Sequence, residues 1–80
     1  MSADPYVPIA CAFHESLEFA VLRRARLRLV YRDGANEREV RVLPTDVATR
    51  EGAEGLSYTD ESGEKGIVRL DRIVSAGTIS

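Results

Sequence analysis

The chain has a single cysteine and a single lysine, and none of its apolar runs is long. One cysteine, Cys11, excludes a disulfide within the chain and fits a reducing compartment. A membrane-spanning helix needs about 20 consecutive apolar residues, and no stretch approaches that length. No basic leader precedes the first apolar stretch, within residues 1–13, which argues against a signal peptide. We therefore expect a cytoplasmic protein with no membrane contact.

The length of the chain limits its architecture to one small domain, residues 1–80. A chain this short buries only about 60–65% of the surface that its unfolded form exposes. That excludes a two-domain enzyme with its active site between the domains. A hydrophobic content of 44% with 30% charged residues is typical of a globular fold and not of a disordered chain.

Few residues offer catalytic or metal-binding chemistry. Cys11 and His14 have the spacing of half a zinc site, but zinc needs four ligands, or three and a water. The chain has no other cysteine or histidine, so carboxylates or a second chain would have to complete the site. Cys11, His14 and Glu15 also contain the groups of a nucleophilic triad, yet side chains so close on one short segment diverge. We predict no catalytic residue, no metal site and no cofactor.

The only predicted helix covers residues 13–23, because Pro5 and Pro8 favour an extended segment over residues 1–12. At about 100° per residue, one helical face is apolar and should pack on the rest of the domain. That face carries Phe13, Leu17, Ala20 and Val21. The opposite face mixes two carboxylates with two large apolar side chains: Glu15, Glu18, Phe19 and Leu22. Such a patch is a candidate partner surface, although a small domain can also simply leave an apolar residue or two exposed.

After the helix the hydrophobic period changes to two, which indicates strands. We predict five short strands, over residues 25–32, 37–43, 54–59, 66–70 and 73–76. Turns or breaks separate them at Asp33-Gly34, Glu51-Gly52, Ser62-Gly63 and Asp71-Arg72. Pro44 should end the second strand or mark a sheet edge, and residues 45–50 are less regular. One helix and five strands predict a mostly β fold, a small partly open barrel over residues 25–76 that the helix caps.

Charge is nearly balanced overall but uneven along the chain. The net charge is −2, and an acidic excess disfavours tight nucleic-acid binding. Residues 23–32 nevertheless hold five arginines and no acid. The outward stripe of Arg26, Arg28 and Arg32 has the chemistry to bind phosphate. Alternatively, Glu37 and Glu39 of the next strand neutralise the stripe across the turn. We favour the second interpretation and keep an RNA-binding module as the alternative function.

Six short motifs follow one another along the chain. Those in the first half are Tyr6-x-Pro8-Ile9-x-Cys11, Leu17-Glu18-x-Ala20 and Tyr31-x-Asp33-Gly34. Those in the second half are Asp46-x-x-x-Arg50, Glu54-x-Leu56 and Arg69-Leu70-Asp71-Arg72-Ile73. No single motif is specific, but their order and spacing over residues 6–75 together resemble the Rho-binding antiterminator (Rof-like) family.

The resemblance implies a small Sm-like, SH3-like fold, in which an N-terminal helix precedes a strongly bent five-stranded sheet. The resemblance also implies a binding function, with no catalysed reaction. Such proteins act as monomers on Rho, the hexameric bacterial transcription termination factor. They bind its primary RNA-binding sites, block RNA loading and reduce termination, and we expect no direct contact with nucleic acid.

The expected contacts with Rho form two groups. An acidic surface suits a basic site built for RNA, since it mimics phosphate. The first group is therefore the outward helix surface, with His14, Glu15, Glu18, Phe19 and Leu22. The second group is the loop that the family uses, with Arg50 and Glu51.

Overall fold

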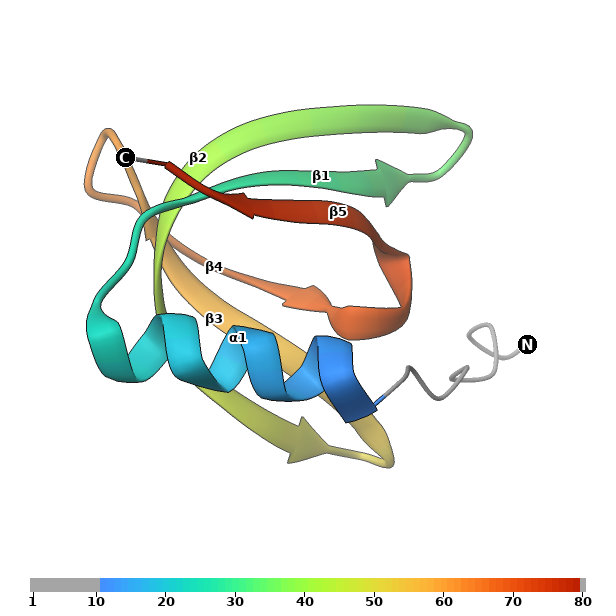
Figure 1. Ribbon diagram of the computed structural model, residues 1–80. Helices are drawn as coiled ribbons and strands as arrows, with labels where there is room; N and C mark the ends of the chain where they lie inside the picture. The colour runs from blue at the N-terminus through green and yellow to red at the C-terminus, as the bar shows by residue number, and fades with distance from the viewer. Residues whose placement is uncertain (1–10, 80) are drawn as a thin grey trace.

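The computed structural model describes residues 11–79 of the chain (Figure 1). One helix, α1 (Cys11–Arg23), precedes five strands and a short 3₁₀ helix. The strands are β1 (Leu27–Asp33), β2 (Asn36–Arg50), β3 (Ala53–Asp60), β4 (Lys65–Arg69) and β5 (Ile73–Thr78), and η1 (Leu70–Arg72) lies between the last two. They form one antiparallel sheet in the order β4-β3-β2-β1-β5. Within the described residues β4 and β5 do not pair with each other, so the predicted mostly β, partly open architecture is confirmed.

The helix begins two residues before its predicted start. The prediction of an extended segment was wrong for Cys11 and Ala12, which lie in the helix, and residues 1–10 lie outside the described range. Pro8 is the last residue that opposes a helix, and Ala12 has the highest helix propensity of any residue type. At the other end, Arg24 adopts a left-handed conformation with φ of 54°. Its N–H donates to Val21 and the N–H of Ala25 to Ala20, which ends the helix in a Schellman motif.

Strand β2 is long, and it gives the sheet its bend. Its first half pairs with β1, up to Val42 opposite Leu27, and its second half pairs with β3. Figure 1 shows β2 curving from the top of the molecule to the hairpin below the helix. Of the two roles predicted for Pro44, the end of the strand was wrong, because β2 continues to Arg50. The sheet edge is correct at this point, because beyond Val42 the strand pairs only with β3. Pro44 is buried beside a register shift at Thr45, where β2 no longer pairs with β1, so the ladder tolerates a residue without an amide donor.

The core lies between α1 and the concave face of the sheet. It consists of the fully or nearly buried side chains Leu17, Ala20, Leu27, Leu29, Val42, Leu56, Val68 and Leu70. Phe13 and Val21 pack against this cluster, so the predicted apolar helix face is confirmed. Tyr31 and Tyr58 also pack against the core. Burial, and after it the neighbouring Tyr31 and Asp60, raises the pKa of the Tyr58 hydroxyl.

Two turns fix the strand order. Gly34, with φ of 65°, lies in the two-residue turn between β1 and β2, and Asn36 already pairs with Asp33. In the β3–β4 turn, Asp60 Oδ1 accepts hydrogen bonds from the Ser62 hydroxyl at 2.7 Å and from the Glu64 N–H at 3.0 Å. These hydrogen bonds, of which the one from the Ser62 hydroxyl has the largest effect, hold the pKa of Asp60 below its usual range.

Among the described residues, no helix has the length and apolar character that crossing a membrane requires.

Candidate functional site

The outward face of α1 carries the predicted mixture of acidic and apolar side chains. All four members are exposed: Glu15, Glu18, Phe19 and Leu22. Leu22 is 77% exposed and Phe19 is 55% exposed, well above what a core-facing residue shows. Arg23 stands over the Phe19 ring, with its guanidinium carbon 5.9 Å from the ring centroid, within the range of a cation–π contact. The helix therefore presents two large apolar side chains to solvent beside two carboxylates.

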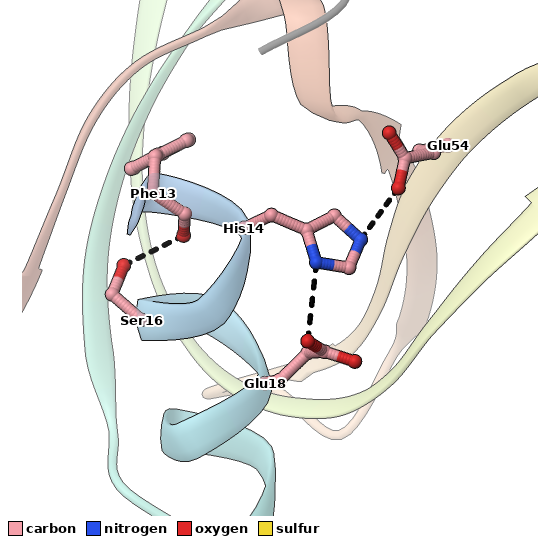
Figure 2. Close-up of polar contacts among 5 residues, drawn as sticks. All are labelled: Phe13, His14, Ser16, Glu18 and Glu54. Carbon is pink, nitrogen blue, oxygen red and sulfur yellow. Dashed lines mark hydrogen bonds and ion pairs between the residues drawn. The ribbon is translucent and has the colours of Figure 1, made fainter. Parts of the chain in front are cut away.

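His14 joins this helix face to the sheet (Figure 2). Its Nδ1 lies 3.1 Å from Glu18 Oε1 on the next helical turn, and its Nε2 lies 2.5 Å from Glu54 Oε2 on β3. Both ring nitrogens donate at once only when the imidazole carries two N–H protons and a positive charge, because carboxylates only accept. His14 and Glu54 are about three-quarters buried, with side chains 25% and 30% exposed.

Glu54 is a site residue that the sequence interpretation missed. It appeared only as part of a family motif, with no contact assigned to it. Its place beside His14 follows from the β2–β3 register, in which Glu54 is opposite Thr49. That register is a tertiary property, and no local signal near either residue reports it. Figure 2 shows His14 between the two carboxylates, which approach the ring from opposite sides.

A shallow groove of about 220 Å³ runs between α1 and the second half of β2. Its floor is apolar and two carboxylates flank it; the lining residues are Glu18, Val21, Leu22, Asp46 and Val47. Asp46 was also not among the predicted contact residues. Since Asp46 and Glu18 come from different elements, the acidic character of the helix face continues onto the sheet.

The Arg50–Glu51 turn joins β2 to β3, and both residues are exposed. Glu51 has φ of 52° and Gly52 has φ of 79°, so the turn has two left-handed residues. Asparagine or glycine fills the first of these positions with less strain than glutamate. The turn lies near the N-terminal end of α1 in Figure 1, and Glu54, three residues after Glu51, reaches His14. The two predicted contact groups are therefore neighbours in space.

We call this region the docking surface. Its members are His14, Glu15, Glu18, Phe19, Leu22, Asp46, Arg50, Glu51 and Glu54. Five carboxylates face two basic side chains, of which His14 is already held by two of the five. The surface is thus acidic around an apolar centre, which suits contact with a basic partner.

The arginine stripe is on the opposite side of the molecule, on the outer face of the sheet. Leu27 and Leu29 point into the core, so the alternate residues of β1 point outward. Of the predicted pairings, Arg28 lies 3.8 Å from Glu39, although both side chains are more than half exposed. The guanidinium of Arg32 instead donates to the backbone carbonyl of Asp71 at 3.1 Å. Cross-strand neutralisation of the stripe is therefore only partial.

The described residues offer no metal-binding group of three or more histidine, cysteine, aspartate or glutamate side chains. Glu18 and Glu54 contact different nitrogens of His14 and so lie on opposite sides of the ring. The side chain of Cys11 lies outside the described part of the structure.

Models of known protein families gave no match to the sequence, and a search of curated proteins found no relative.

Proposed function

We propose that this protein is a non-catalytic inhibitor of transcription termination that binds Rho. The docking surface contacts the primary RNA-binding sites of the Rho hexamer and blocks RNA loading. The observation that carries the proposal is the acidic docking surface with two exposed apolar side chains, Phe19 and Leu22, at its centre. The resemblance of the sequence motifs to the Rof-like family supplies the identity of the partner.

The chemistry of the surface supports this choice of partner. A site that holds RNA is basic, because most of its affinity comes from cationic contacts with phosphates. Carboxylates at Glu15, Glu18 and Asp46 offer such a site the negative charge that RNA offers, which speeds encounter and fixes register. Phe19 and Leu22 add apolar area that becomes desolvated on contact, and desolvated apolar anchors dominate many interfaces.

The rigidity of the surface also supports a binding role. Leu17 and Ala20 anchor α1 in the core, and the His14 contact with Glu54 fixes the helix to β3. A surface held in place before contact loses less conformational entropy on binding. We include in the proposal that the protein acts in the cytoplasm as a monomer, and that its bent five-stranded sheet is an Sm-like domain.

Transcription in vitro tests the proposal. The template carries a Rho-dependent terminator, and purified Rho and RNA polymerase are assayed with and without the protein. We expect readthrough to rise with protein concentration, and a template with an intrinsic terminator to show no change. The E15K/E18K double variant should lose the effect, because it reverses two of the charges around the apolar centre of the docking surface. Termination that is unchanged by the wild-type protein would reject the proposal.

A further inference from the structure

Two arginines face each other on the outer surface of the sheet, away from the docking surface. Arg28 of β1 and Arg41 of β2 are direct cross-strand partners, and both are exposed. Like charges directly opposite in a sheet destabilise it. The fold thus maintains an unfavourable pairing at this point, where a ligand of opposite charge would offset the repulsion.

The surroundings of this pair leave room for such a ligand. Arg41 and Arg26 line one hollow of about 320 Å³, together with side chains that include Leu43, Thr59 and Ile79. On the side of β1 away from β2, Arg28 is opposite Gly77 of β5. A Cβ atom at Gly77 would meet no other atom within 4 Å. Open space therefore lies beside Arg41 in the hollow and beside the Gly77 partner of Arg28 on β5.

Three carboxylates lie near Arg26, Arg28 and Arg41, but among the described residues only Glu39 forms an ion pair with one of these arginines. Glu39 lies 3.8 Å from Arg28, and Asp60 and Glu61 line the hollow. Asp60 Oδ1 already accepts three hydrogen bonds within its own turn. Among residues 11–79, neither Arg26 nor Arg41 has an ion pair within 4.0 Å. The guanidinium groups of Arg26 and Arg41 thus keep their N–H donors available for a ligand.

We propose that Arg26, Arg28 and Arg41 form a binding site for a phosphate group. The guanidinium fork matches phosphate oxygens in shape and charge, and Thr59 adds a hydroxyl at the same hollow. The site differs from the stripe that the sequence predicted. Arg41 belongs to it, and Arg32 does not, because the Arg32 guanidinium donates to the backbone carbonyl of Asp71. It lies on the opposite side of the molecule from the docking surface and does not depend on Rho binding.

The phosphate belongs either to the backbone of single-stranded RNA or to a free anion such as pyrophosphate. Among the described residues, the aromatic side chains are elsewhere: Phe13 and Phe19 lie on the helix, and Tyr31 and Tyr58 pack toward the core. Stacking of bases on aromatic side chains, which stabilises many complexes with single-stranded nucleic acid, is therefore not part of this site. Any RNA binding should be independent of base sequence and strongly weakened by salt.

Two probes test the site with the full chain. Fluorescence anisotropy measures binding of a labelled ten-nucleotide oligouridine RNA at low salt, and a thermal shift measures binding of inorganic pyrophosphate. The variants are R28Q and R41Q, with R38Q as the matched control. Arg38 is on the same strand as Arg41 but pairs with Asp33 at 2.8 Å, near the hairpin turn. Each of R28Q and R41Q should weaken binding about tenfold, as expected for loss of a charge-assisted hydrogen bond, and R38Q should leave it unchanged.

The stability of the variants separates binding from folding. R41Q should melt at the wild-type temperature or above, because it removes the like-charge repulsion. Binding of both probes, or of RNA alone, assigns the site to backbone phosphate, and binding of pyrophosphate alone assigns it to a free anion. The proposal is overturned if neither probe binds the wild-type protein, or if R28Q and R41Q bind as tightly as R38Q.

Discussion

Breaking the contact between His14 and Glu54 should weaken the attachment of α1 to the β2–β3 hairpin by a measurable amount. The ring nitrogen and the carboxylate oxygen are 2.5 Å apart, and the side chains are only 25% and 30% exposed. A hydrogen bond to a charged group contributes about 1.5–3 kcal/mol when well buried, and an exposed ion pair contributes less than about 1 kcal/mol. The burial here is intermediate, so we expect a coupling energy of about 1 kcal/mol.

A double-mutant cycle with H14Q, E54Q and the double variant isolates this pair, because the other contacts of each residue cancel. Urea unfolding followed by far-UV circular dichroism gives the four stabilities. In a domain of this size about 1 kcal/mol corresponds to about 4–8 °C in melting temperature. The control cycle is Arg28 with Glu39, which lie 3.8 Å apart and are 62% and 56% exposed; its coupling should be below about 0.5 kcal/mol. Equal coupling energies in the two cycles would show that partial burial does not strengthen the contact between His14 and Glu54.

Four further substitutions probe the rest of the fold. A Cβ at Gly66 would lie 2.7 Å from the Tyr58 ring, so G66A should cost about 1–3 kcal/mol in urea unfolding, as overpacking does. Asp60 has a lowered pKa in the folded state, so its contribution to stability is present above about pH 4 and is lost as the pH falls further. Melting curves of D60N between pH 2 and 7 should therefore show a smaller loss of stability in acid than the wild type. Arg24 has a left-handed φ of 54°, so R24G should stabilise the protein by about 0.5–1 kcal/mol. R23G, inside the helix, should instead destabilise it by about 1 kcal/mol.

The faces of the helix could be predicted from the sequence because they depend on local spacing. Apolar residues at helical intervals placed Leu17 and Ala20 in the core and left Phe19 and Leu22 exposed, as the structure has them. The period of two in residues 25–32 likewise separates Leu27 and Leu29, which are buried, from Arg26 and Arg28, which are exposed. Both patterns are set by the geometry of a single element, which neighbouring residues in the chain determine.

The course of β2 could not be predicted in the same way. Pro44 is a strand breaker by local rules, yet the strand continues to Arg50. Whether a missing donor matters depends on which residues lie opposite, and the register shift at Thr45 is visible only when β3 is in place. Residues 45–50 show no regular alternation, so the sequence did not predict the second half of β2, which carries Asp46.

The polar contacts of the candidate sites were also outside the reach of local patterns. The sequence predicted that Glu37 and Glu39 neutralise the arginine stripe. The register places Glu37 opposite Arg32, but the Arg32 guanidinium donates to the backbone carbonyl of Asp71 instead. The contact between His14 and Glu54 joins a helix to a strand far along the chain. Such pairs depend on how the elements pack, and no residue spacing reports that.

Equilibrium binding to purified Rho measures directly whether the docking surface holds this partner. Labelled wild-type protein is titrated with Rho hexamer, beside the E15K/E18K variant and an E61K/E64K control. The control reverses two exposed carboxylates in the β3–β4 turn, away from α1, and so changes the net charge equally. We expect E15K/E18K to weaken binding at least tenfold and the control to bind nearly as the wild type does. Equal affinity of the two variants, or no binding of the wild-type protein to Rho, would contradict this expectation.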